Sequence, residues 1–180
     1  LALDLLSSAG ERDRFLKTIA IAATALAVLA LFTGLTSPAG YVLWFFDAGT
    51  EQPTLGPFVY RNQFAALVEA VFPVLLWYSI ADRGRRFAYT LAAAVLFASV
   101  IGAGSRAGSI LCSAELVAIP AVALWRGHIS RVVFAQAAAS ILAASAVFTL
   151  AVGRRFLWDR MQEPNPYAMR AELVKSSWEM

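Results

Sequence analysis

Of the 180 residues in the chain, 59% are hydrophobic and 15% are charged, whereas a soluble globular domain carries roughly 25% charged residues. With a mean hydropathy of +0.65, this composition excludes an ordinary soluble domain and predicts an all-α fold, a polytopic transmembrane helical bundle. The net charge of +3 does not indicate nucleic-acid binding, because the cations flank apolar runs, where they set membrane topology.

Five apolar segments predict five membrane spans, each near the roughly 20 residues that cross a hydrocarbon core. In chain order they cover about residues 18–35, 62–80, 87–102, 107–125 and 132–152. Residues 1–152 thus form the predicted transmembrane region, and residues 153–180 the start of an external loop with a helix. Because the chain starts at Leu1 rather than Met and stops within that helix, we expect an internal segment of a longer protein.

Two connections between the spans have a clear composition. Residues 36–59 hold several prolines and glycines, two carboxylates and no lysine or arginine, which is typical of an external loop. Its aromatic residues favour an interfacial belt or a short surface helix. The small residues around Ser105-Arg106 predict a tight hairpin between the third and fourth spans.

Cations at the ends of the spans predict the orientation. If the first end lies inside, eight cations lie on the inner side: Arg12, Arg14, Lys17, Arg83, Arg85, Arg86, Arg126 and Arg131. The outer ends of the first four spans hold only Arg61 and Arg106. The positive-inside rule therefore puts Arg61 and Arg106 outside. Three further outer arginines, Arg154, Arg155 and Arg160, oppose this count, although external loops tolerate cations.

Arginines at the boundary between membrane and water suit a lipid-linked phosphate. A guanidinium group gives bidentate, charge-assisted hydrogen bonds to phosphate oxygens and keeps its proton. The arginines on the predicted outer face are Arg61, Arg106, Arg154, Arg155, Arg160 and Arg170. Such a cluster would hold an isoprenoid diphosphate and stabilise the charge that develops as it leaves, without a metal. With one cysteine, Cys112, and one histidine, His128, the chain has no metal-ligand cluster, and we expect no cofactor.

Three short motifs follow one another on the predicted outer face: Gly56-Pro57-Phe58 with Arg61-Asn62-Gln63-Phe64-Ala65, Ser105-Arg106-Ala107-Gly108-Ser109, and Arg170 at the start of a helix. In order, spacing and placement, the chain from about Thr18 to Met180 resembles the O-antigen ligase and O-antigen polymerase superfamily. The resemblance implies a multi-pass glycosyltransferase of the bacterial inner membrane. Such an enzyme moves a glycan from undecaprenyl diphosphate to a lipid or glycan acceptor at the periplasmic face.

The resemblance also implies roles for particular residues. Arg61, Arg106 and Arg170 correspond to diphosphate contacts with a catalytic effect, and Asn62 and Ser105 complete the substrate-binding set. The family's later glycine-rich stretch and its external histidine, the expected general base, have no counterpart in this chain. His128 is predicted to face the cytoplasm, so we expect this segment alone to be inactive.

Other interpretations of these residues stay open. Arg61 can simply anchor its span, and Arg170 can belong to a solvated helix. Glu69 and Glu115 lie roughly 10–14 Å inside their spans by helical rise, where carboxylates form either helix–helix hydrogen bonds or proton and ion sites. A polysaccharide polymerase on the same donor, a small-solute transporter using these carboxylates, and a structural scaffold are the alternatives to a ligase.

Overall fold

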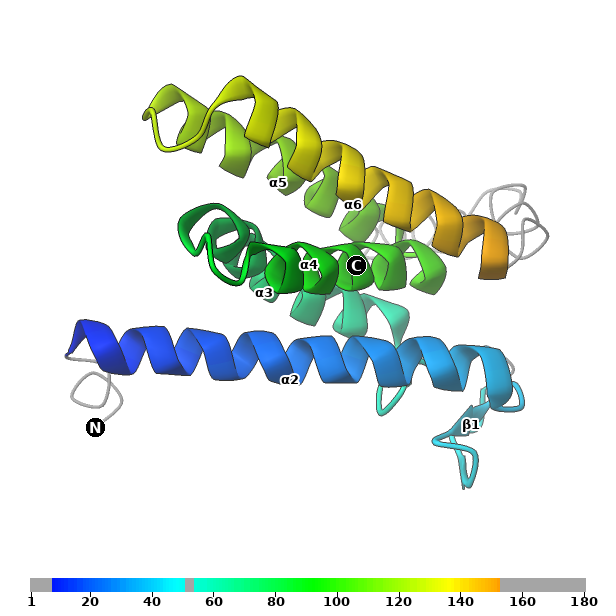
Figure 1. Cartoon of the computed structure of the whole chain (residues 1–180). Helices are drawn as coiled ribbons and strands as arrows, with labels where there is room; N and C mark the ends of the chain where they lie inside the picture. Colours follow the sequence, from blue (N-terminus) through cyan, green and yellow to red (C-terminus); the bar gives the residue numbers. More distant parts are fainter. Residues whose placement is uncertain (1–7, 51–53, 153–180) are drawn as a thin grey trace, which may run out of the picture.

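The described residues of the computed structural model, 8–50 and 54–152, form five α-helices and one short β-hairpin. The helices are α2 (Ala9–Thr36), α3 (Arg61–Ala81), α4 (Arg86–Ala103), α5 (Arg106–Trp125) and α6 (Arg131–Val152). In Figure 1 they lie in three layers, with α2 on one side, α3 and α4 in the middle, and α5 and α6 on the other side. The prediction of an all-α helical bundle is confirmed.

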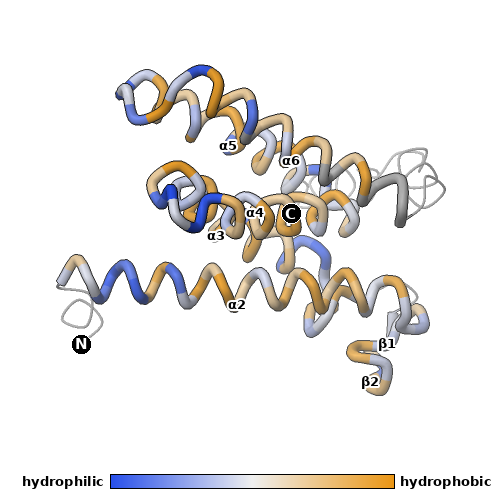
Figure 2. The backbone as a smooth tube through the Cα atoms, viewed as in Figure 1, coloured by the Kyte–Doolittle hydropathy of each residue, from blue (hydrophilic) through white to orange (hydrophobic). Residues whose placement is uncertain are grey.

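Four of the described helices, α2 to α5, are long and apolar enough to cross a membrane. This finding supports a multi-pass membrane protein. Helix α6 occupies the fifth predicted span, whose crossing of the membrane stays a prediction. Figure 2 shows most hydrophilic residues at one end of the bundle, where α2 begins and where the α3–α4 and α5–α6 turns lie.

Helix α2 begins well before the first predicted span because Ser8 and Glu11 form a capping box. The Ser8 Oγ accepts the Glu11 backbone N–H at 3.1 Å, and the Ser8 backbone N–H donates to Glu11 Oε2 at 3.3 Å. These bonds satisfy two backbone donors at the helix start. The charged stretch 11–14, predicted to border the span, therefore forms the first turns of the same helix.

The core lies between α3 and α4 and extends to their neighbours. Large side chains fill it, including Phe64, Phe72, Leu75 and Leu96. Helix α2 packs differently, since its buried positions are Ala20, Ala23, Ala27, Ala30 and Thr33. Small residues at this spacing form a smooth stripe on one helix face, which lets α2 approach α3 and α4 closely.

The α2–α3 connection is a hairpin and a turn, so the predicted alternative of a surface helix is wrong. Strand β1 (Tyr41–Val42) pairs antiparallel with β2 (Phe46–Asp47). Between them Trp44 donates from Nε1 to the Thr36 hydroxyl at 2.9 Å and sets its ring edge against Phe32. The hairpin is thus docked on the end of α2.

The Gly56 turn ties this connection to the bundle. Gly56 has a φ of +57°, which a residue with a side chain adopts only with strain. Leu55 and Phe58 exchange two backbone hydrogen bonds of 3.0 Å around it. The Gly56 N–H donates to the Oγ1 of the fully buried Thr33 at 2.8 Å. Helix α2 and the start of α3 are therefore joined by a polar contact inside the protein.

Replacing Thr33 by valine should weaken this junction. Thr33→Val keeps the shape of the side chain but leaves the buried Gly56 N–H without its acceptor, which costs about 1–3 kcal/mol. The free energy of unfolding in mixed detergent micelles measures the effect. Thr24→Val is the matched control, because Thr24 bonds only to the Ala20 carbonyl of its own helix. Equal losses in the two variants would contradict the assigned role of Thr33.

Candidate functional site

The starts of α3 and α5 lie together at one end of the bundle. Arg61 is the first residue of α3 and Arg106 is the first residue of α5. The residues beside them are in contact, since the Ser105 hydroxyl donates to Asn62 Oδ1 at 3.4 Å. Four of the five residues predicted for the site thus lie at two adjoining helix starts.

Ser105 owes its position to the short link between α4 and α5. Gly104 ends α4 in the left-handed conformation with a φ of 65°, and Ser105 caps α5 by accepting the Gly108 N–H at 3.3 Å. Ser105 is 3% exposed. Its hydroxyl therefore serves the fold by capping α5 and bonding Asn62, while contact of either residue with a substrate stays a prediction.

The start of α3 is electropositive. Its N-cap residue, Tyr60, makes no side-chain hydrogen bond to the helix, unlike Ser8 in α2 and Ser105 in α5. The first N–H groups of a helix carry a partial positive charge and attract anions. Together with the half-buried Arg61 and the exposed Arg106, this end of the protein offers an anion both guanidinium groups and backbone donors.

The third predicted arginine cannot be placed beside them. Arg170 lies outside the described residues, as do Arg154, Arg155 and Arg160. The described part of the site therefore consists of the starts of α3 and α5. A contribution from residues 153–180 stays a prediction.

Close packing of α5 on α3 brings the two helix starts together. A Cβ atom on Gly108 would lie 2.9 Å from Ala65 Cβ, 3.0 Å from Glu69 Oε1 and 3.1 Å from Val100 Cγ1. Only glycine fits there without movement of its neighbours. The predicted tight hairpin of the third and fourth spans holds for their short link, but α5 packs chiefly on α3, and α6 packs on α4.

Two carboxylates lie deeper in the same interface. Glu69 Oε1 of α3 lies beside Gly108, and Glu115 follows Gly108 about two helical turns further along α5. The Glu115 Oε2 atom is buried and has no hydrogen-bond partner among the described residues. Within the part of the chain that the structure describes, Glu115 Oε2 therefore makes no helix–helix hydrogen bond of the predicted kind.

The opposite end of the bundle holds a second polar cluster that sequence reasoning missed. The Tyr78 hydroxyl donates to Asp13 Oδ1 at 2.8 Å, and Lys17 Nζ lies 2.7 Å from Asp13 Oδ2. Trp77 packs its ring against His128 with centroids 6.0 Å apart. His128 thus lies at the end away from Arg61, too far to act as a base beside it, while its facing the cytoplasm stays a prediction.

These contacts also show that the eight cations assigned to the inner side lie at one end of the bundle. The start of α2, the α3–α4 turn and the α5–α6 turn share one end, whereas Arg61 and Arg106 begin helices at the other. The separation of charges on which the orientation depends is therefore present in the fold. The side of the membrane that each end faces stays a prediction.

Comparison with known proteins finds no matching family model, no similar curated protein and no similar solved structure. The resemblance to the O-antigen ligase superfamily therefore stays a prediction from short motifs.

Gly108→Ala should separate α3 from α5. Alanine favours a helix by about 1 kcal/mol over glycine, but overpacking of a filled interface costs about 1–3 kcal/mol, so we expect a net loss of stability. Thermal unfolding in detergent measures it. Gly10→Ala is the control, because a Cβ there meets nothing within 4 Å.

The double variant Ala65→Gly with Gly108→Ala tests the cause of that loss. Removing the Ala65 methyl vacates the space that the new methyl needs, so part of the lost stability should return. If the double variant is no more stable than Gly108→Ala alone, the close contact between α3 and α5 is not the origin of the effect.

Proposed function

We propose that this chain belongs to a membrane glycosyltransferase of the O-antigen ligase type. The enzyme transfers a glycan from undecaprenyl diphosphate to a sugar hydroxyl of a lipid or glycan acceptor at the periplasmic face of the bacterial inner membrane. The observation that supports this proposal is the Ser105–Asn62 contact, which joins the two helix starts that carry Arg61 and Arg106.

The chemistry of the donor fits these helix starts. A diphosphate carries oxygens on two phosphorus atoms, so two guanidinium groups and the first N–H groups of α3 supply donors over its length. Arg170 joins them by the family resemblance. Because this end adjoins apolar helices, the isoprenoid chain remains in the membrane while the diphosphate and its glycan reach the water.

The reaction needs charge stabilisation at the leaving group. The acceptor oxygen attacks the anomeric carbon, the bond from that carbon to the diphosphate oxygen breaks, and undecaprenyl diphosphate leaves with the bonding electrons. Fixed donors at the place where this charge develops lower the barrier more than mobile water does. The acceptor proton goes to a general base, which the resemblance assigns to a histidine outside this chain.

The orientation that the proposal needs agrees with the charges of the bundle. The end with Arg61 and Arg106 lies opposite the end with eight cations, and cation-rich ends stay in the cytoplasm. The proposed site then faces the periplasm, where lipid-linked glycans are joined to their acceptors. A polymerase that acts on the same donor would need the same orientation and the same arginines.

Glu69 and Glu115 favour a second candidate function, a proton- or ion-coupled transporter of small solutes. The supporting observation is the buried Glu115 Oε2 without a described hydrogen-bond partner. Carboxylates at such depth are costly unless they are protonated, paired or functional. A scaffold without either activity would depend on none of these side chains.

Replacing Arg106 by lysine in the full-length protein distinguishes a diphosphate clamp from a membrane anchor. Arg106→Lys keeps the charge but loses the planar fork, so we expect glycan transfer to fall by about 10²-fold, as for the loss of one transition-state donor. Transfer from undecaprenyl-diphosphate-linked glycan in membranes measures it. Arg126→Lys, at the other end of the bundle, should retain full transfer. Unchanged transfer in Arg106→Lys would overturn the proposed role.

Glu115→Gln tests the transporter. The amide has nearly the same size and cannot carry a charge, so a proton-coupled transporter would lose solute uptake while a ligase would keep glycan transfer. We expect transfer within about threefold of the wild type, since the change lies roughly two turns from Arg106 along α5. Loss of uptake in intact cells, with no glycan transfer by the wild type, would replace the ligase by the transporter.

A further inference from the structure

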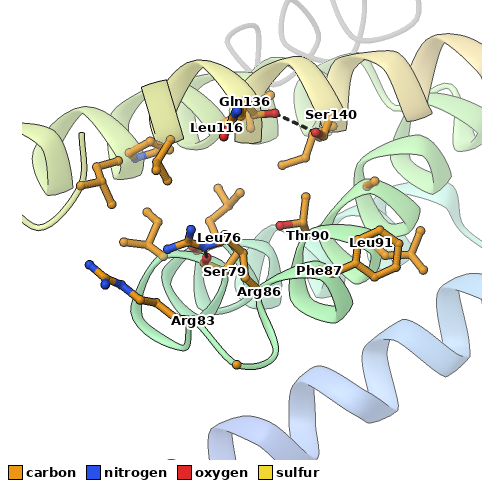
Figure 3. Close-up of a pocket in the computed structure, with 17 residues that line it drawn as sticks. Leu76, Ser79, Arg83, Arg86, Phe87, Thr90, Leu91, Leu116, Gln136 and Ser140 are labelled. Carbon is orange, nitrogen blue, oxygen red and sulfur yellow. Dashed lines mark hydrogen bonds between the residues drawn. The ribbon is translucent and has the colours of Figure 1, made fainter. Parts of the chain in front are cut away.

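A pocket of about 760 Å³ lies between the α3–α4 pair and the α5–α6 pair. It is located toward the end of the bundle that holds the α3–α4 turn, away from Arg61 and Arg106. Figure 3 shows Arg83 and Arg86 on one side of the space and Gln136 and Ser140 of α6 on the other. Its volume is in the range of ligand sites, roughly 300–1,000 Å³.

The lining of the pocket changes from charged to apolar along the bundle. Arg83 and Arg86 lie where α4 begins, and Leu91, Ala94 and Leu116 line the part nearer the middle. Eight residues separate Arg86 from Ala94, about 12 Å of helical rise. Thr90 also lines the pocket between these levels. A ligand that fits this space is therefore anionic at one end and apolar along its length.

The Arg86 guanidinium is held in place, and neither arginine is neutralised by a described residue. Arg86 donates from Nε to the Ser79 carbonyl at 3.0 Å, which holds its side chain against α3. Neither Arg83 nor Arg86 forms an ion pair within residues 8–50 and 54–152. Asp82, the acid in the same turn, accepts the Gly84 N–H through Oδ1 at 3.1 Å instead.

We propose that this pocket binds an anionic membrane phospholipid, with its phosphate on Arg83 and Arg86 and an acyl chain against Leu91, Ala94 and Leu116. Arginine matches the phosphate through paired hydrogen bonds. Basic pockets between transmembrane helices on the cytoplasmic side are a known way of holding such headgroups. Free phosphate would leave the apolar walls bare, and a zwitterionic lipid would bring the cation of its headgroup close to the two arginines.

This inference stands apart from the proposed glycosyltransferase. The pocket and the paired helix starts lie at opposite ends of the bundle and share no residue. The phospholipid is a resident of the membrane rather than a substrate, and it fills space between the two helix pairs. Its binding should stabilise the protein whether or not glycan transfer is found.

Binding can be measured on the delipidated full-length protein in a neutral detergent. Titration with dioleoyl phosphatidylglycerol should raise the thermal midpoint, and native mass spectrometry should show a bound lipid. Dioleoyl phosphatidylcholine has the same acyl chains but no net charge, and we expect it to bind at least tenfold more weakly. Inorganic phosphate should give no shift at equal concentration. Equal binding of the two lipids, or a full shift with phosphate alone, would overturn the proposal.

Variants locate the site. Arg83→Gln with Arg86→Gln should weaken phosphatidylglycerol binding at least tenfold. Arg83→Gln alone, at an exposed position in a turn, should weaken it severalfold, which keeps the test decisive if the double variant does not fold. Thr90→Phe fills the pocket and should also block binding. The control Arg126→Gln changes an arginine at the same end but outside the lining and should bind like the wild type. Wild-type binding by Arg83→Gln and Thr90→Phe would refute the site.

Discussion

The absence of a side chain at Gly108 is the constraint on which the arrangement of α3 and α5 depends. Side-chain atoms of α3 and α4 lie 2.9 to 3.1 Å from the place where a Cβ would be, so a larger residue at this position would push α5 away from α3. The close approach of these two helices aligns their first residues and permits the Ser105–Asn62 hydrogen bond. Helices α3 and α4 separate Arg61 from Arg106 in the chain, yet the two arginines begin helices that pack together.

The bundle consequently has two chemically different ends. One end holds the starts of α3 and α5, Arg61, Arg106 and the docked hairpin, and the described residues leave the start of α3 without a side-chain cap. At the other end, turns rich in cations surround the Asp13–Tyr78 pair and the Arg83–Arg86 pocket. The phosphate ligands that we propose for the two ends differ in their surroundings: the first end has uncapped backbone donors at the start of α3, and the second has a pocket between helices.

The positions of the helices can be predicted from the sequence more accurately than the pairs of helices that pack together. Apolar length and boundary cations are local properties, so spans such as 62–80 and 87–102 agree with α3 and α4 within a residue or so. The early start of α2 was also encoded locally, in Ser8 and Glu11, but the capping box was overlooked. Packing is not local, and nothing in the sequence pairs α5 with α3 in preference to α4.

The candidate site, too, has some features that the sequence predicts and others that only the packing reveals. The predicted neighbourhood of Arg61 and Arg106 followed from counting alternate ends of spans, which needs no knowledge of packing. Thr33 accepts a hydrogen bond from the Gly56 N–H. This contact could not be predicted from the sequence, because the two residues are 23 positions apart and threonine is common inside membrane spans. The depth of Glu69 and Glu115 in their spans can be predicted from the sequence, but the lack of a described partner for Glu115 Oε2 requires side-chain positions.

Helix α2 has a consequence for biosynthesis. Its buried face is alanine and threonine, too small to interdigitate strongly, and polar contacts to Gly56 and Tyr78 fix its two ends. Both partners are synthesised after α2, and Tyr78 belongs to the last turns of α3. These two polar contacts can therefore form only after α3 has been synthesised. Until then the capping box of Ser8 and Glu11, which belongs to α2 itself, stabilises the start of the helix.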